Sequence, residues 1–132
     1  MKCLIVEDDL ISSRILEGLI SRYATCNDAI NSQEAMAQFL KAHESGTPYD
    51  LILMDIMMPE TNGLQTVRLI REKEELMNIP LMHRVKVIMT TALDDPRTVI
   101  KALFESDANS YITKPVTARK LADELRNIKL IL

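Results

Sequence analysis

The sequence predicts an α/β fold in which helices cover both faces of a doubly wound, five-stranded parallel sheet. Short apolar runs alternate with longer stretches of helical period, as in chains built from strand–helix units. The runs are hydrophobic at nearly every position, which suits strands that are buried on both faces. Because crossovers between parallel strands are right-handed, five such units place helices on both sides of one sheet.

Five short segments are expected to form the strands. The strongest pattern is found in three apolar runs, at Lys2–Val6, Leu51–Met54 and Val85–Met89. Two weaker candidates, Tyr23–Ala29 and Ser110–Ile112, complete the set. Each of the five is followed by a segment of helical spacing, so the expected order is strand and helix five times over.

Apolar residues recur at helical spacing between the strands, so each of these helices is expected to have one apolar face. The positions expected to share a face are Ile11, Ile15, Leu16, Leu19 and Ile20 in the first helix, Leu64, Val67 and Ile70 in the third, and Leu121, Leu125, Ile128 and Leu132 in the last. Three helices also have recognisable starts. Asn31 followed by Glu34 resembles a capping box, and Asp95 precedes Pro96 as a cap precedes a first helical proline. Thr117 can cap the last helix.

Length and composition limit the function classes. A chain of 132 residues with 47% hydrophobic residues is expected to form one domain with its own core. The net charge of −3 argues against wrapping nucleic acid or binding anionic membranes, and the lack of Trp argues against a base-stacking platform. No apolar run is long enough for a membrane helix, and the acidic residues 7–9 exclude a signal peptide. The protein is therefore expected to be soluble and cytoplasmic.

The two cysteines, Cys3 and Cys26, both lie in segments expected to be strands. Free cysteine behaves as a small apolar residue, so two buried, reduced thiols are expected. A disulfide or a redox pair is the alternative.

Chemically reactive residue types follow the expected strands at the edge where the carboxyl ends meet, which is where sheets of this kind bind ligands. They are Glu7, Asp8 and Asp9 after the first strand, Asp55 after the third, Thr91 and Ala92 after the fourth, and Lys114 after the fifth. Carboxylates from two strands would repel each other, and a few oxygen ligands of this type suit Mg²⁺. Asp55 can act as a nucleophile, while Lys114 and the Thr91 hydroxyl can neutralise a phosphoryl group. Each residue alone is a common cap or loop residue, but their agreement at four strand ends points to phosphoryl transfer.

These residues resemble the receiver domain of bacterial two-component response regulators, a flavodoxin-like fold, and in particular single-domain receivers of the chemotaxis-switch kind. The resemblance covers essentially the whole chain. The segments that carry it are Ile5–Asp9, Met54–Pro59 through Gly63, Thr91–Ala92 and Tyr111–Pro115. Their order and spacing make it specific. Residues 1–132 are then expected to be one receiver domain with no output domain in the chain, or one domain of a longer protein.

The resemblance implies a role for each site residue. Asp55 would accept a phosphoryl group from a phosphohistidine on a sensor histidine kinase or phosphotransfer protein. Mg²⁺ would be bound by Asp8, Asp55 and the backbone carbonyl of Met57. Glu7 would assist through a coordinated water. The residues implied around the phosphoryl group are Thr91 and Ala92 for binding it, Lys114 for pairing with it, and Tyr111 as an aromatic switch.

The resemblance also implies an effect of phosphorylation on partner binding. The face made by the fourth helix, fifth strand and fifth helix would switch the binding of a downstream protein, whose identity stays open. The protein would not be an enzyme, apart from catalysing its own phosphorylation and dephosphorylation. No direct contact with nucleic acid or membrane is expected, and a phosphorylation-dependent dimer is left open.

The sequence departs from the family pattern at three places. Asp107 stands where many relatives have glycine, and Asp tolerates the left-handed conformation better than most residues. The connection from Lys73 to Arg84 is long, and it is expected to extend the third helix with an apolar cover over the sheet edge, or to form a Met-rich contact surface. Its apolar residues are Leu76, Met77, Pro80, Leu81 and Met82. Met57 and Leu93, which flank the phosphoryl group in this family, cannot position an attacking water, so slow self-dephosphorylation is expected.

Three other functions agree less well with the residues. A pseudo-receiver that only binds partners is disfavoured because the acidic, hydroxyl and lysine residues of the site are all present. An aspartyl-phosphate hydrolase would need a second acid two residues after the nucleophile, where Met57 stands. A flavin-binding relative would need hydroxyl-rich phosphate contacts after the first strand, where this chain has acids.

Overall fold

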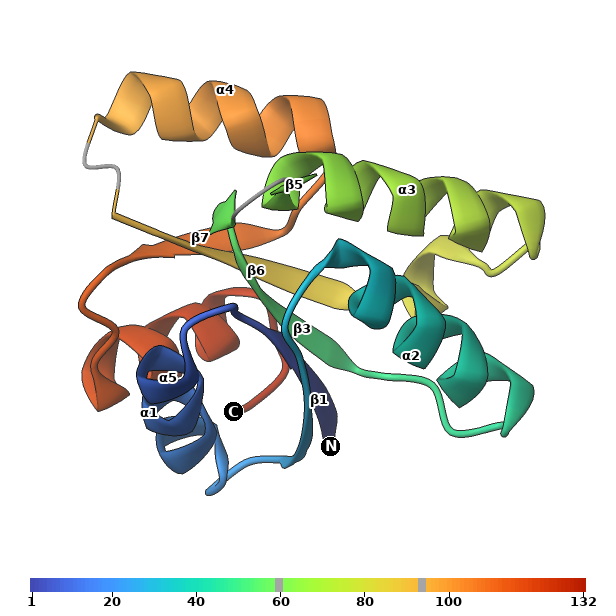
Figure 1. Cartoon of the computed structure of the whole chain (residues 1–132), viewed down its shortest axis with the longest axis horizontal. Coiled ribbons are helices and arrows are strands. Elements are labelled where there is room, and N and C mark those ends of the chain that lie inside the picture. Colours follow the sequence, from blue (N-terminus) through green and yellow to red (C-terminus); the bar gives the residue numbers. More distant parts are fainter. Residues whose placement is uncertain (59–60, 93–94) are drawn as a thin grey trace.

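Five parallel strands form the central sheet, in the order β2–β1–β3–β6–β7 (Figure 1). The computed structural model describes residues 1–58, 61–92 and 95–132, apart from the side chains of Thr61 and Thr98. The strands of the sheet are β1 (Lys2–Val6), β2 (Thr25–Ala29), β3 (Leu51–Asp55), β6 (Lys86–Thr91) and β7 (Ser110–Thr113). The helices are α1 (Leu10–Ile20), α2 (Ser32–Glu44), α3 (Gly63–Leu76), α4 (Pro96–Ser106) and α5 (Ala118–Asn127). The predicted α/β fold with helices on both faces is confirmed.

The helices form two layers around the sheet. Helices α1 and α5 lie together on one face, while α2, α3 and α4 cover the other (Figure 1). Each face has its own core: the first is formed with α2, α3 and α4, and the second with α1 and α5. The helix residues that fill these cores include Phe39, Val67, Ile70 and Leu103 in the first, and Leu16, Ile20, Leu121 and Leu125 in the second. Strands β1, β3 and β6 are buried on both faces, as their continuous hydrophobicity predicts.

The expected helix starts are confirmed by their capping hydrogen bonds. The Asn31 side chain accepts from the backbone N–H of Glu34 at 2.8 Å. Asp95 accepts from Arg97 at 3.2 Å, and Thr117 caps α5 in the same way. Each cap satisfies one of the backbone N–H groups that a helix leaves unpaired at its first turn.

Some expectations about apolar faces are wrong. The helical pattern places Ile11 and Ile15 on the apolar face of α1, but they are 71% and 54% exposed. The last helix ends at Asn127, so Leu132 lies beyond it and is fully exposed. A helical apolar pattern does not say how much of it a neighbouring element covers, and the sheet reaches only the Leu16 and Ile20 side of α1.

Two further short strands, β4 (Met57–Met58) and β5 (Thr61–Asn62), pair antiparallel just after β3. The sequence pattern does not predict them, because two residues are too short for an alternation to be seen. Pro59, which is part of the motif after Asp55, and Leu93, which is expected to flank the phosphoryl group, lie outside the described residues.

The long connection after α3 differs in part from expectation. The helix does extend, to Leu76, and a short 3₁₀ turn follows at Leu81–His83. Its apolar side chains do not cover the sheet edge, since Leu81 and Met82 are 77% and 80% exposed. The connection is instead anchored by the buried Glu74 carboxylate, which accepts from the Val85 backbone N–H at 2.8 Å and pairs with Arg71 at 2.7 Å.

The end of α4 agrees with the prediction for its unusual residue. Asp107 has a φ of 63°, in the left-handed region, and its backbone N–H donates to the carbonyl of Leu103. Asp is therefore accommodated at the helix end where a glycine would be favoured.

In the described part of the chain, no helix combines the length and apolar character that crossing a membrane requires.

Candidate functional site

The site lies where β1, β3 and β7 end at the same edge of the sheet. Glu7 directly follows β1, Asp55 is the last residue of β3, and Lys114 directly follows β7. Because parallel strands present their carboxyl ends on one side, residues that are far apart in the sequence meet here. The side chains of Glu7 and Asp55 are almost completely buried. Two adjacent buried carboxylates are costly unless a positive charge compensates them.

Lys114 supplies that positive charge. Its Nζ lies 3.1 Å from Glu7 Oε2 and 3.4 Å from Asp55 Oδ1, and its side chain is 30% exposed. Its backbone N–H donates to the carbonyl of Thr91 at 2.7 Å, which fixes the start of the loop. Burial lowers the pKa of Lys114. The hydrogen bond to Glu7 and the charges of both carboxylates raise this pKa by more, so its net shift is upward. The ammonium group therefore stays protonated at neutral pH.

Three carboxylates converge at one side of this ion pair. One oxygen each from Glu7, Asp8 and Asp55 lies within 4.8 Å of the others. Asp8 is exposed, while the other two are buried. Burial, together with the charge of Asp55, raises the pKa of Glu7 from 4.5 to about 6, despite the opposing hydrogen bond from Lys114. Burial and the charge of Asp55 thus both disfavour ionised Glu7, and a divalent cation with oxygen ligands would stabilise the ionised carboxylates.

Met57 lies next to the Asp55 carboxylate. Its backbone N–H donates to Asp55 Oδ1 at 3.3 Å, and its side chain is exposed. The backbone around Asp55 is further fixed by Ile56, whose N–H donates to the carbonyl of Thr90 at 3.0 Å. Asp55, the candidate phosphoacceptor, is thus held in place through the backbone N–H groups of the two residues that follow it.

Gly63, the first residue of α3, packs directly against the backbone of Asp55. A Cβ at this position would overlap the Asp55 carbonyl oxygen and lie 3.1 Å from the Cα of Ile56. The N–H of Gly63 also donates to the carbonyl of Ile56 at 2.9 Å. In the sequence Gly63 is only the end of a motif, and this packing role is not predicted from it. The only signal in the sequence is that glycine is rare in this chain, with three in total.

The end of β6 brings Thr91 and Ala92 to the same edge, while Tyr111 lies further back on β7. Thr91 is fully buried at the last position of the strand, and Ala92 follows it on the surface. Tyr111 lies on β7, half-buried, and packs against the first core. Thr90, which pairs with Asp55 in the strand register, is buried with its hydroxyl unpaired among the described residues. The sequence does not predict this unpaired group.

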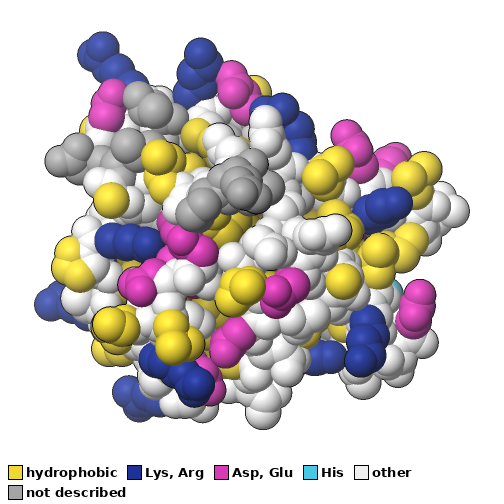
Figure 2. Space-filling model, viewed as in Figure 1, with side chains coloured by type: hydrophobic (Ala, Val, Ile, Leu, Met, Phe, Trp, Pro, Cys, Tyr) yellow, Lys and Arg dark blue, Asp and Glu magenta, His cyan; other side chains and the backbone are white. Residues whose placement is uncertain are grey.

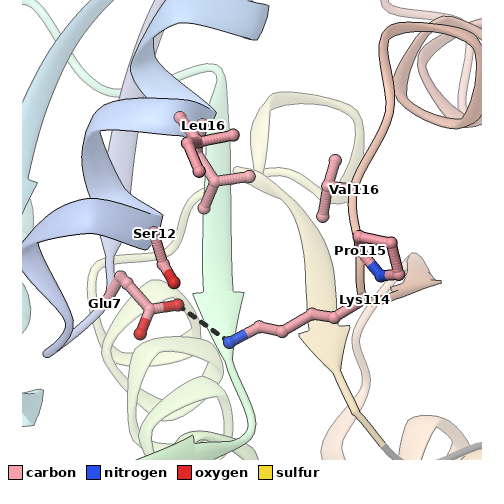
Figure 3. A pocket seen from close by; sticks show the side chains of 7 residues that line it. Glu7, Ser12, Leu16, Lys114, Pro115 and Val116 are labelled. Atoms are coloured by element: carbon pink, nitrogen blue, oxygen red, sulfur yellow. Dashed lines mark hydrogen bonds and ion pairs between the residues drawn. The ribbon is translucent and has the colours of Figure 1, made fainter.

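A pocket of about 420 Å³ opens beside the ion pair. Figure 3 shows Glu7 and Lys114 pointing toward each other at its base, with Ser12 and Leu16 from α1 on one wall. Pro115 and Val116 form the opposite wall (Figure 3). The lining is mostly apolar around one charged pair, which is the usual composition of a recognition site.

Helix α1 carries exposed apolar side chains, one of which lines this pocket. Leu10 and Ile11 are largely exposed, and Ile15 also lines the pocket wall. Figure 2 shows hydrophobic side chains over the region of α1 and α5, at the lower left, with acidic side chains beside a basic one just above them. Charged groups and an apolar surface therefore adjoin on this face of the molecule.

Three carboxylates and one lysine thus meet where the strands end. The sequence of the chain also matches a known family of domains. A model of the response regulator receiver domain matches residues 3–126. The chain belongs to this family. It is a receiver domain of two-component signal transduction, as the sequence motifs indicate.

Individual relatives agree with this receiver assignment. The chain is 35% identical to transcriptional regulatory protein ResD of Bacillus subtilis over 122 residues, which cover 91% of this chain and 44% of ResD. It is 30% identical to chemotaxis protein CheY1 of Helicobacter pylori over 125 residues, 95% of this chain and 94% of CheY1. The chain thus spans less than half the length of ResD but nearly all of CheY1.

A solved structure also matches closely. It is the co-crystal structure of the Saccharomyces cerevisiae histidine phosphotransfer signaling protein Ypd1 and the receiver domain of its downstream response regulator Ssk1. The TM-score is 0.76 at 26% identity, with 94% of this chain and 85% of the matched chain covered. The receiver fold is therefore shared over nearly the whole chain.

Proposed function

We propose that this receiver domain takes a phosphoryl group onto Asp55 from a phosphohistidine on a histidine kinase or phosphotransfer protein. The observation that carries the proposal is the Asp55 carboxylate, buried at a strand end and held 3.4 Å from the Lys114 ammonium. A carboxylate can act as a nucleophile toward phosphorus when its own charge and the charge of the phosphoryl group are both compensated.

The residues of the site have separable roles in this transfer. An oxygen of Asp55 attacks phosphorus, the new P–O bond forms, and the P–N bond to the donor histidine breaks with its electron pair going to the imidazole. Lys114 neutralises a phosphoryl oxygen, while Thr91 and the small Ala92 bind and make room for the group. Tyr111 is proposed to follow Thr91 when the phosphoryl group draws it inward.

Mg²⁺ fits the donor set of the acidic cluster. Asp8 and Asp55, with the Met57 backbone carbonyl, would hold the cation directly, and Glu7 would hold it through water. When bound, it supplies positive charge to the phosphoryl oxygens and to the crowded carboxylates. The upward shift in the pKa of Glu7 supports a site that is built for a cation, since burial and repulsion of this size oppose the metal-free, ionised state.

The donor is proposed to dock on the exposed apolar surface of α1. Leu10, Ile11 and Ile15 are exposed apolar residues of α1, and Ile15 lines the pocket that leads to Lys114. A protein that delivers a phosphohistidine must bring its imidazole to Asp55, which pairs with the pocket residue Lys114, so an apolar contact on α1 would orient the transfer. The matched structure of Ypd1 with the Ssk1 receiver domain supports a partner of the phosphotransfer class.

The output is proposed to run through the face of α4, β7 and α5. Tyr111 lies on β7, and β7 is an edge strand of the sheet, so its rearrangement would change this surface. We propose that residues 1–132 act as one signalling domain of this kind, which turns over no external substrate and contacts no nucleic acid directly. A phosphorylation-dependent dimer through the same face is one form that this output could take.

The test is the intact mass of the protein after incubation with acetyl phosphate and Mg²⁺. A single phosphoryl adduct that disappears in Asp55→Ala and with a chelator supports the proposal. The decay of the adduct reads out the lifetime, which is proposed to be long because the exposed Met57 side chain cannot hydrogen-bond an attacking water. Folded protein that forms no adduct would instead favour a pseudo-receiver, whose partner binding is independent of phosphate.

A further inference from the structure

The two cysteines of the chain meet across the edge of the sheet, away from the phosphoacceptor site. Cys3 on β1 is the register partner of Cys26 on β2, and both belong to the second core. Partners in a parallel ladder place their side chains on the same face, with strands spaced about 4.8 Å apart. That spacing is within the Cα separation of about 4.4–6.8 Å that disulfides require.

The two thiols also interact electrostatically. The interaction between the two thiols lowers the pKa of Cys26 and, together with burial, raises that of Cys3. The Cys26 thiol in turn lies 4.0 Å from the carbonyl oxygen of Ala24, which accepts from it. Cys26 is therefore the thiol of the pair that ionises more readily, and the thiolate is the nucleophilic form.

The two cysteines also differ in how far solvent can reach them, and this difference again favours Cys26 as the thiol that reacts first. Cys3 is completely buried, whereas Cys26 is half-buried. Strand β2 is the edge strand and pairs only with β1 among the described strands. Reagents in solvent can reach Cys26, and an edge strand can shift slightly to bring the two sulfurs into bonding distance.

We propose that Cys3 and Cys26 form a reversible redox pair, which a small-molecule disulfide oxidises to an intrachain disulfide joining β1 to β2. Cys26, as the thiolate, attacks one sulfur of oxidised glutathione, so a mixed disulfide forms and one glutathione thiolate leaves with the proton. The Cys3 sulfur then attacks Cys26, its proton passes to the second leaving glutathione, and the protein disulfide forms. Two protein thiols lose two electrons in total, and one oxidised glutathione becomes two reduced glutathiones.

The second step is the slower one, because Cys3 is buried and its thiol ionises less readily. The mixed disulfide on Cys26 is therefore expected to appear first and then decay. Because Cys26 is half-buried on an edge strand, a thiol in solvent can reach the closed disulfide, and accessible disulfides are readily reduced. This makes the pair suited to reversible oxidation rather than to a permanent structural link.

The experiment treats the folded full chain with oxidised glutathione, quenches with acid, and measures intact mass with and without alkylation after denaturation. The expected product has lost the mass of two hydrogens, has no thiol left to alkylate, and regains both thiols with dithiothreitol. A wild-type protein that stops at the mixed disulfide, forms only covalent dimers, or keeps both thiols while folded would overturn the proposal.

Two variants assign the steps. Cys26→Ser changes a half-buried edge position, and Cys3 alone is expected to stay unmodified in the folded protein. Cys3→Ala leaves Cys26 to form the mixed disulfide, which should then persist. If Cys26→Ser reacts as fast as the wild type, Cys26 is not the entry point and the assignment fails. Circular dichroism of each variant checks that it is folded, and the wild-type result stands even if Cys3→Ala does not fold.

Discussion

Replacing Lys114 by methionine tests whether the site is held together by one cation between two buried carboxylates. Lys114 Nζ lies 3.1 Å from Glu7 Oε2 and 3.4 Å from Asp55 Oδ1. Methionine keeps most of the length and apolar stem of lysine but removes the charge. The variant therefore leaves two adjacent carboxylates without their partner and changes the packing little.

The expected loss can be worked from these distances. With an effective dielectric constant of about 20, each ion pair contributes roughly 5 kcal/mol of Coulomb attraction before desolvation is subtracted. Removing one partner of a buried pair costs about 3–5 kcal/mol. Since the Lys114 side chain is 30% exposed, we expect the metal-free protein to lose about 2–4 kcal/mol of unfolding free energy. For a chain of this size, that lowers Tm by roughly 10 °C.

The assay is thermal unfolding of wild type and Lys114→Met, each with a chelator and with saturating Mg²⁺. Mg²⁺ bound by the carboxylates would replace the missing charge, so it should raise the Tm of the variant by more than that of the wild type. Lys101→Met is the matched control, because Lys101 is 77% exposed and lies 4.0 Å from Glu105. A surface pair of this kind contributes about 0–1 kcal/mol, so the control should change little.

Two results would refute this reasoning. If Lys114→Met unfolds at the same temperature as the wild type with a chelator, the ammonium does not compensate buried charge. If Mg²⁺ stabilises both proteins equally, the cation and Lys114 do not act on the same carboxylates.

Single contacts in the structure give three further predictions. Gly63→Ala should destabilise the protein by about 1–3 kcal/mol and slow phosphoryl acceptance, because the new Cβ overlaps the Asp55 carbonyl. Its control, Gly18→Ala, lies in open space within α1 and should stabilise the protein by about 0.5–1 kcal/mol. If chemical denaturation shows the same effect for both variants, Gly63 does not have this packing role. Thr90→Val removes a buried hydroxyl that lacks a partner among the described residues, so denaturation should show a gain of about 1 kcal/mol, and a loss would reveal a hidden partner. The folded-state pKa of Glu7, about 6, lies above its ordinary value of 4.5, so the metal-free fold takes up a proton and gains stability as pH falls from about 7 to about 5. Glu7→Gln should therefore be more stable than wild type near neutral pH, and a Tm difference that does not shrink toward acid pH would contradict this.

The fold is predictable because its signals are local and repeated. Continuous apolar runs identify β1, β3 and β6, and the caps at Asn31, Asp95 and Thr117 identify helix starts. The convergence of Glu7 and Asp55 is also predictable, because in a parallel sheet every carboxyl end lies on one side. The alternation of strands and helices along the chain therefore indicates where the site lies.

Other features depend on contacts that no local pattern encodes. The exposure of Ile11 and Ile15 depends on which part of α1 the sheet reaches, and a helical period cannot report that. The contact of Gly63 with Asp55 joins the start of α3 to the end of β3 across the short β4–β5 pair, and no local pattern in the sequence reports such a contact. The buried Glu74, which anchors the connection after α3, looks in the sequence like part of an ordinary solvated charge run.

The most direct test of Asp55 as phosphoacceptor is to locate the phosphoryl group on the chain. After incubation with acetyl phosphate and Mg²⁺, borohydride reduces an acyl phosphate to the alcohol, so a phosphorylated aspartate becomes homoserine. Peptide mass spectrometry is predicted to find homoserine at position 55 and at no other aspartate, with none formed when a chelator is present. Homoserine at Asp8 or Asp9, or a stable phosphoryl group on a serine or threonine, would contradict Asp55 as the phosphoacceptor.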